Sequence, residues 1–133
     1  ENRQWNMALV GVGGLGRAIV GYGRFTPQGF KIVAAFAQDP AKVGKKVGNL
    51  IVKDMKDLAD TIKRENIQIG IVAVPASSAL QVIETLEEVG VKAILNYAPV
   101  TAPRGKAKIQ DIDPVLKLQS MTYYLKQNDS PKK

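Results

Sequence analysis

The feature that most constrains this sequence is a glycine-rich turn near its amino terminus. Four apolar residues, 7–10, run directly into the pattern Gly11-x-Gly13-x-x-Gly16, and an apolar segment with helical spacing follows over residues 15–22. The order of these segments predicts a buried strand that turns through the glycines into a helix. A chain of 133 residues has room for one domain built around such a unit.

These glycines have the spacing that a dinucleotide-binding turn requires. Gly11 permits the tight turn, Gly13 removes the side chain that would hold the backbone away from phosphate groups, and Gly16 lets the helix pack closely on the strand. The N–H groups at the start of the helix lack intrahelical partners and face the anion. The pattern therefore predicts a pyrophosphate site, and the alternative is a strand-turn-helix packing motif with no ligand.

The alternation of apolar patterns along the chain predicts the fold class. Apolar runs over residues 30–36, 67–74 and 91–95 are typical of buried strands, and helical periodicity occupies the segments 54–65 and 77–89 between them. Strands and helices that alternate with short connections predict an α/β, Rossmann-like, doubly wound and mainly parallel sheet with helices on both faces. A ligand would lie across the carboxyl ends of its strands.

Shorter elements and helix caps complete this prediction. The expected caps are Asp39, Asp54 and Ser77 or Ser78. The shorter elements are a helix over residues 40–43 closed by Gly44, an edge strand over residues 50–52, a strand over residues 109–112 and a last helix from Pro114 to about Gln127. Residues 1–127 are thus predicted to form one domain, followed by a polar tail over residues 128–133.

Composition and charge exclude several functions. The chain has no Cys and no His, which removes disulfides, thiolate nucleophiles and the commonest general base and metal ligand, so any redox role has to run through a bound cofactor. The net charge is +7, but Lys and Arg are spread along the chain, which favours a solvated basic surface over a nucleic-acid interface. No apolar run is long enough to span a bilayer and no leader pattern is present, so a cytoplasmic location is expected.

Residues 1–5 are polar and lack an initiator Met, which favours a start within a linker.

The ends of the predicted strands supply the rest of the candidate site. The residues expected to contact a cofactor are Gly11, Val12, Gly13, Gly14, Leu15, Gly16, Ala37, Gln38, Val74, Pro75, Ala76, Asn96, Tyr97, Ala98 and Pro99. No catalytic residue and no metal ligand is predicted, because Tyr97 is the only plausible acid at these strand ends and Lys92 lies too far back to lower its pKa. The alternative is an enzyme, such as the cofactor domain of a dehydrogenase or a CoA-binding ligase subunit. The lack of acid-base side chains at the strand ends disfavours this alternative.

Several phrases of the sequence, taken in order, resemble the C-terminal half of the redox-sensing transcriptional repressors of the Rex family. They are Trp5-Asn6 before residues 8–18, residues 39–44, 73–76 and 90–100, and Ile112-Asp113 ahead of residues 118–120. Many families share the glycine pattern, but the phrase over residues 96–100 and the ending over residues 113–125 are much more specific. The match covers nearly the whole chain.

This resemblance implies a cytoplasmic homodimer in which each subunit joins an N-terminal winged-helix DNA-binding domain to an NAD(H)-binding domain. NADH binding closes the dimer and releases operator DNA, and NAD⁺ permits DNA binding. The winged-helix domain is missing from this chain, so DNA binding would depend on a domain that is not present here. The alternative is a plain nucleotide-binding or oligomerisation module of a larger protein. This alternative differs from the repressor interpretation only in the domain that preceded Glu1.

The resemblance also implies that the last helix crosses to the partner subunit. Residues 99–108 make a connection long enough for such an exchange. The apolar stripe of this helix and the two tyrosines beside it are Val115, Leu118, Met121, Leu125, Tyr123 and Tyr124. The alternative is that the stripe packs on the sheet of its own subunit.

The end of the second strand departs from the family's pattern. Family members place an acidic residue there that binds the adenosine ribose, where this chain has Ala37 and then Gln38. Because no carboxylate repels a 2′-phosphate and lysines follow at positions 42, 45 and 46, NADP(H) joins NAD(H) as a candidate cofactor. Asp39 is favoured as a cap over a ribose ligand.

Two further positions bear on how the family's pattern applies. Gly14 stands where relatives often have Asn, which removes one side-chain contact. Asp113 corresponds to an acidic residue that can pair with an arginine of the DNA-binding domain. A helix N-cap before Pro114 is the other interpretation of Asp113, and the two roles are compatible.

Overall fold

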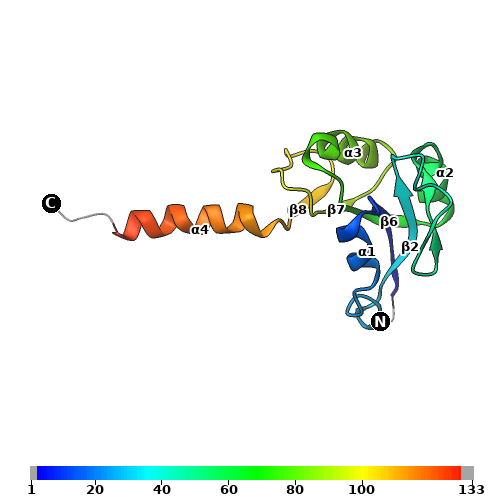
Figure 1. The fold of residues 1–133 in the computed structure, drawn as a ribbon, viewed down its shortest axis with the longest axis horizontal. Coiled ribbons are helices and arrows are strands. Elements are labelled where there is room, and N and C mark those ends of the chain that lie inside the picture. Colours follow the sequence, from blue (N-terminus) through cyan, green and yellow to red (C-terminus); the bar gives the residue numbers. More distant parts are fainter. Residues whose placement is uncertain (1–2, 130–133) are drawn as a thin grey trace.

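A six-stranded parallel sheet lies at the centre of the fold (Figure 1). The computed structural model describes residues 3–129 of the chain. The strands are β1 (Trp5–Val10), β2 (Phe30–Ala37), β5 (Lys53–Asp54), β6 (Ile67–Val72), β7 (Ala93–Asn96) and β8 (Lys108–Asp111). Their order is β5-β2-β1-β6-β7-β8, and each neighbouring pair is parallel. The predicted Rossmann-like, doubly wound sheet is confirmed, and the direction of winding reverses between β1 and β6.

Elements on both faces of the sheet bury its central strands. These elements are α1 (Gly14–Val20), the hairpin of β3 (Lys46–Val47) and β4 (Leu50–Ile51), α2 (Leu58–Arg64) and α3 (Ala76–Glu88), with 3₁₀ turns η1 (Thr26–Gln28) and η2 (Met55–Asp57). Met7 and Leu9 of β1 share a core with α1 and the hairpin. Ala8 and Val10 belong to the core under α2 and α3. Successive side chains of a strand point to opposite faces, so β1 is apolar throughout.

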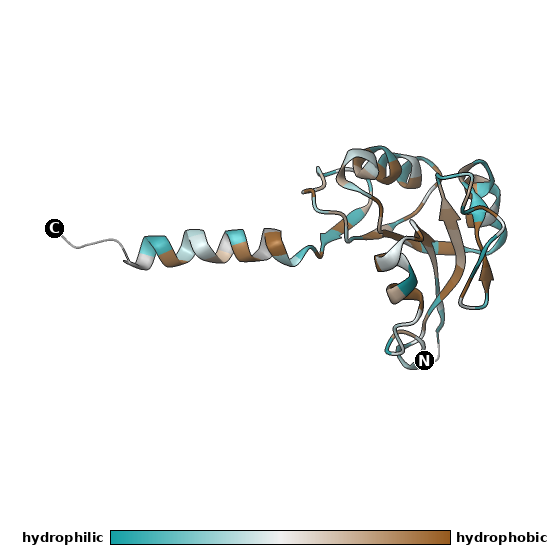
Figure 2. Cartoon of the chain, in the orientation of Figure 1, coloured by the Kyte–Doolittle hydropathy of each residue, from teal (hydrophilic) through white to brown (hydrophobic). Residues whose placement is uncertain are grey.

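The last helix, α4 (Pro114–Asp129), projects away from this body and carries apolar residues along its length (Figure 2). All six residues named for its stripe expose more than half of their surface, from 55% for Val115 to 67% for Tyr123. The alternative that this stripe packs on its own sheet is therefore wrong. The predicted polar tail begins inside α4, and residues 130–133 lie outside the described part of the chain.

The expected helix over residues 40–43 is a series of turns. Its bonds are of the i→i+3 type, such as Lys42 N–H to the Asp39 carbonyl oxygen at 3.0 Å, and Gly44 at φ +85° ends them before an α-helical turn can form. Asp39 nevertheless caps the first turn, because its Oδ1 accepts the N–H of Ala41 at 2.9 Å.

The expected edge strand over residues 50–52 is not part of the main sheet. β4 pairs antiparallel with β3 in a separate hairpin, and Gly48 at φ +58° supports the turn between them. The edge position beside β2 belongs to β5. Two residues per strand give too short a pattern for the sequence to reveal this pairing.

The two remaining cap predictions have different outcomes. Asp54 is confirmed as a cap, because its Oδ1 accepts the N–H of Lys56 at 2.9 Å at the start of η2, which leads into α2. Capping of α3 by Ser77 or Ser78 is wrong: Pro75 is the N-cap, with φ −60° and ψ 157°, and no side chain caps this helix. The fixed φ of proline starts the helix before the serines are reached.

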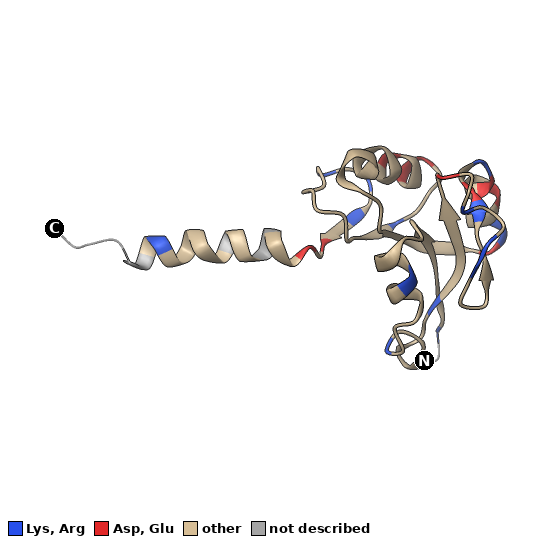
Figure 3. Ribbon diagram, in the orientation of Figure 1, with Lys and Arg blue, Asp and Glu red and all other residues tan. Residues whose placement is uncertain are grey.

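Charged residues are distributed over the described surface. Figure 3 shows Lys and Arg on several elements, with acidic residues among them around α2. No helix within residues 3–129 combines the length and the apolar character needed to cross a bilayer.

Candidate functional site

The glycine-rich turn connects β1 to α1 at the carboxyl edge of the sheet. Gly11 has φ +107°, a conformation that favours glycine, and a Cβ built there would overlap the carbonyl oxygen of Ala73 just after β6. A Cβ at Gly16 would overlap the carbonyl oxygen of Gly11. Close approach of the turn to the chain after β6 therefore requires glycine at position 11, and close packing of α1 on the turn requires glycine at position 16.

Gly13 is different, because no atom of the described residues lies within 4 Å of the place its Cβ would take. It is the N-cap of α1 with φ −73°, which any residue adopts. Gly14 has the same open surroundings. Packing does not require glycine at position 13, and two physical reasons for it remain: glycine is a favourable N-cap residue, and it lets a ligand approach the backbone closely.

Backbone hydrogen bonds join the loops at this edge. Ala73 N–H donates to the carbonyl oxygen of Val10 at 2.8 Å, which joins the loop after β6 to β1. Tyr97 N–H donates to the carbonyl oxygen of Val72 at 2.8 Å, which joins the loop after β7 to β6. The turn after β1 and the loops after β6 and β7 thus form one continuous rim at the point where the winding reverses, the usual place for a ligand in such sheets.

The predicted contact residues divide into an exposed and a buried set. The exposed residues are Gly13, Gly14, Leu15, Gln38, Pro75, Ala76 and Pro99. The buried residues are Gly11, Val12, Gly16, Ala37, Val74, Asn96 and Ala98, and Tyr97 is intermediate. The buried set can meet a ligand mainly through backbone atoms, so side-chain contacts have to come from the exposed set.

An acidic residue pairs in the sheet with the predicted ribose-binding position, although the sequence indicates it only as a helix cap. Ala37, the last residue of β2, is 4% exposed and pairs in register with Asp54 of β5. This pairing joins two segments that are far apart in the sequence through a strand of two residues. No local pattern could have shown that Asp54 ends next to Ala37.

Tyr97 lies on the α1 side of the sheet. It lines a cavity of about 290 Å³ together with Ala18, Ile19, Tyr22 and Phe25. Desolvation by burial, and then the neighbouring Tyr22, raises the pKa of Tyr97 above its ordinary value of 10.0. A phenol with a raised pKa keeps its proton at neutral pH, so Tyr97 is not poised to act as a general base there.

Asn96 is fully buried, and its side chain is occupied by protein groups. Its Nδ2 donates to the carbonyl oxygen of Val100 at 2.8 Å and to Oδ1 of Asp111 at 2.9 Å. Its Oδ1 accepts the N–H of Ala98 at 3.1 Å. Asp111 does not stand out in the sequence. The register of β7 and β8, which places Asn96 opposite Asp111, brings the two together.

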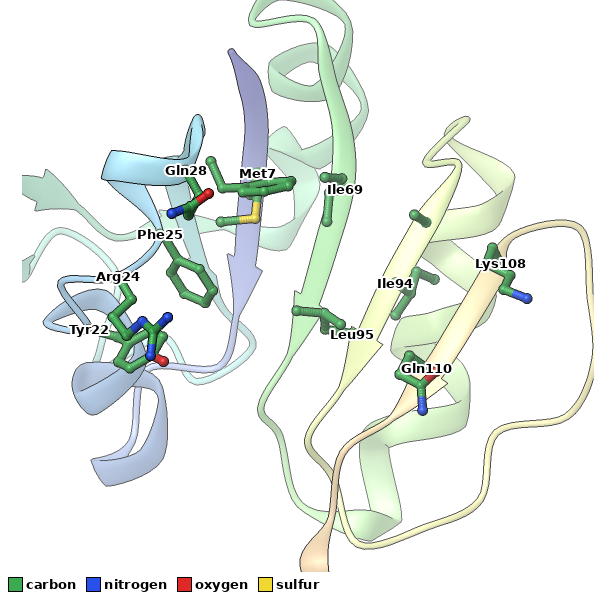
Figure 4. Close-up of a pocket in the computed structure, with 12 residues that line it drawn as sticks. Met7, Tyr22, Arg24, Phe25, Gln28, Ile69, Ile94, Leu95, Lys108 and Gln110 are labelled. Carbon is green, nitrogen blue, oxygen red and sulfur yellow. The ribbon is translucent and has the colours of Figure 1, made fainter. Parts of the chain in front are cut away.

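An apolar groove of about 670 Å³ lies on the α1 side of the sheet, over strands that α1 does not cover (Figure 4). Its lining residues are Met7, Tyr22, Arg24, Phe25, Gln28, Phe30, Ile69, Ala93, Ile94, Leu95, Lys108 and Gln110. The connection from β7 to β8 contains no helix, so no helix of the described chain covers this groove. The sequence indicates this groove in one way: residues 97–107 have no helical pattern, so they supply no helix that would cover β7 and β8.

Comparison with known proteins places this arrangement in a family. Residues 2–100 match the family model described as the CoA binding domain. The chain belongs to this family. It is also 44% identical over 125 residues to the redox-sensing transcriptional repressor Rex of Chloroflexus aggregans, a match that covers 93% of this chain and 59% of the repressor. The chain thus spans about three fifths of the length of that relative.

Solved structures agree with this assignment. The crystal structure of RSP in complex with β-NAD⁺ and operator DNA has a TM-score of 0.84 and 28% identity, covering 96% of this chain and 59% of that one. The complex of RSP with β-NADH has a TM-score of 0.80 and 28% identity, covering 96% of this chain and 62% of that one. RSP is described as a Rex-family repressor. The resemblance to Rex repressors is confirmed, and these relatives are described as transcriptional repressors.

Proposed function

We propose that this chain is the NAD(H)-binding sensor domain of a cytoplasmic, homodimeric, redox-sensing repressor, in which NADH binding releases operator DNA. The observation that carries the proposal is the glycine turn: packing requires Gly11 and Gly16, but open space surrounds Gly13. The similarity to RSP, which has been crystallised in complex with β-NAD⁺ and operator DNA and in complex with β-NADH, supports it. Residues 1–127 form the sensor domain in this proposal, and a winged-helix domain precedes it in the full repressor.

The cofactor extends along the rim in this proposal. Its pyrophosphate lies over residues 11–16, at the N-terminal end of α1, and its adenosine lies towards Ala37 and Gln38. Its nicotinamide lies against Val74-Pro75 and the loop over residues 96–99. We favour NAD(H) over NADP(H), because the Asp54 carboxylate beside Ala37 would repel a 2′-phosphate.

We expect NADH to bind at least about fivefold more tightly than NAD⁺, because the positive charge of the oxidised ring costs more to desolvate against apolar surfaces. The exposed side chains of Pro75 and Pro99 supply such surfaces. Titration calorimetry with NADH, NAD⁺ and ADP-ribose measures this preference. ADP-ribose serves as the matched control, since it lacks the ring. Equal or reversed affinities of NADH and NAD⁺ would remove the redox-sensing function.

We further propose that α4 of each subunit lies in the apolar groove of the other. Leu118, Met121 and Leu125 are each more than 55% exposed in the single chain. The groove exposes apolar side chains of the partner sheet, such as Ile69 and Leu95. Each surface lacks an apolar cover within the described chain, and exposed apolar patches of this kind mark protein interfaces.

Fusing a winged-helix domain ahead of this chain tests the repressor function. NADH shifts DNA affinity only through its different affinity for the two dimer states, so we expect a drop of about 5- to 150-fold, roughly 1–3 kcal/mol. DNA affinity at fixed salt, with and without NADH, measures the effect in wild type and in Asp113→Ala, where a smaller drop is expected. Unchanged DNA affinity despite bound NADH would make this chain a plain nucleotide-binding module.

A further inference from the structure

We infer that Asn96 and Asp111 are positioning residues, which hold the loop over residues 97–102 in the conformation that receives the nicotinamide. This inference rests on the proposed function, because it assigns these two residues a role at the same site. Neither side chain has to touch the cofactor. They act through the backbone of the loop that follows β7.

Both N–H donors of the Asn96 side chain, and its carbonyl oxygen, form hydrogen bonds within the protein. An asparagine amide has two N–H donors and one carbonyl acceptor group. The donors of Asn96 go to the Val100 carbonyl oxygen and to Asp111, and its oxygen accepts the N–H of Ala98. With 0% exposure, Asn96 has no donor left for a ligand. It therefore shapes the segment over residues 98–100 and does not contact the cofactor.

Asp111 fixes the next part of the same loop. Its Oδ1 accepts the N–H of Ala102 at 3.3 Å as well as the Asn96 amide at 2.9 Å. Strand pairing holds Asp111 itself, because Ile112 N–H donates to the carbonyl oxygen of Asn96 at 2.8 Å. The pair thus anchors the loop at three backbone groups, those of Ala98, Val100 and Ala102.

Such anchoring favours binding because the loop already has its bound conformation before the cofactor binds. A loop that has to order on binding loses affinity through the entropy of ordering. Asn96→Asp tests this, since it is nearly isosteric but places a carboxylate oxygen against the Val100 carbonyl oxygen and Asp111. We expect it to weaken NADH binding by about tenfold or more, the scale of one disrupted buried hydrogen bond.

Asp111→Asn provides the rescue. Alone, it keeps an acceptor oxygen for the Asn96 amide, so we expect the NADH dissociation constant to change by no more than about threefold. In Asn96→Asp/Asp111→Asn, the new amide at 111 can donate to the carboxylate at 96. It no longer accepts the Ala102 N–H in that orientation, and the Val100 carbonyl oxygen still faces a carboxylate, so we expect a partial rescue, with an NADH affinity between those of Asn96→Asp and wild type. A purely additive pair would overturn the inference.

Glu87→Ala is the matched control. Its carboxylate accepts the N–H of Ala107 at 3.0 Å and so holds the far end of the same loop. We expect this variant to lower the unfolding temperature without changing the NADH dissociation constant by more than about twofold. If Asn96→Asp lowers NADH affinity no more than Glu87→Ala does, Asn96 and Asp111 stabilise the fold and do not position the loop for the cofactor.

Amide hydrogen exchange separates this inference from the proposed function. In the 133-residue chain without cofactor, Asn96→Asp is expected to speed exchange at Ala98 and Ala102, and unchanged exchange would overturn the anchoring role. Failure of wild type to bind NADH would overturn the proposed function and the nicotinamide role together. If exchange is nevertheless faster in the variant, Asn96 and Asp111 still anchor the loop but have no role in cofactor binding.

Discussion

Replacing Gly13 with Val is expected to abolish NADH binding while the chain remains folded. The Val side chain would fill the space that the pyrophosphate needs, because no described atom lies within 4 Å of the Cβ position. Loss of the phosphate contacts predicts an affinity drop of about 100-fold or more. The cost to the fold is small, about 1 kcal/mol, as for other unfavourable N-caps. Titration calorimetry and thermal unfolding measure the two quantities.

Two other glycines provide controls for this result. Gly23→Val also places its side chain in open space, but away from the rim, and should leave both NADH affinity and stability close to wild type. Gly16→Ala forces a Cβ against the Gly11 carbonyl oxygen and should cost about 1–3 kcal/mol of stability. Retained NADH affinity in Gly13→Val would count against the pyrophosphate site.

The sequence predicts the parts of this fold that depend on local pattern. The turn from Gly11 to Gly16 could be found because its glycines have a fixed spacing and stand between an apolar run and a segment with helical periodicity. The central strands could be found because burial on both faces makes them apolar throughout, as in the run that contains β6. Helices between them follow from periodicity, and right-handed connections then leave few arrangements of the sheet.

Other parts depend on contacts between distant residues, and no local pattern carries them. Asp54 reads as a helix cap, yet strand pairing places it beside Ala37. Asn96 reads as a ligand contact, yet the neighbouring strand supplies Asp111 and turns its amide inward. The β3–β4 hairpin is missed because two-residue strands have no periodicity to detect. The sequence thus predicts the central strands and the glycine turn better than the contacts that hold the loops at their ends.

Reversing the apolar character of α4 is expected to convert the proposed dimer into a monomer. Burial of a Leu or Met side chain contributes about 1.5–3 kcal/mol, and a charge in its place adds a desolvation cost. Leu118→Glu combined with Met121→Glu should therefore raise the dimer dissociation constant by about 100-fold or more. Gln119→Glu adds charge to an exposed polar position of the same helix and serves as the control. Sedimentation velocity over a range of concentrations measures the dissociation constants.

The exchange of α4 has a sharper test, because the chain contains no Cys. Cysteines introduced at Leu118 or Leu125 of α4, together with one at Ile69 or Gln110 of the groove, report where the helix lies in solution. If α4 lies in the partner's groove, mild oxidation links two chains into a covalent dimer, and each single-cysteine variant gives far less. If α4 folds back onto its own sheet, the same pairs close within one chain and no covalent dimer forms. Intrachain closure in a dilute sample would overturn the exchange, and dimers that fail to cross-link at any of these pairs would place the interface elsewhere.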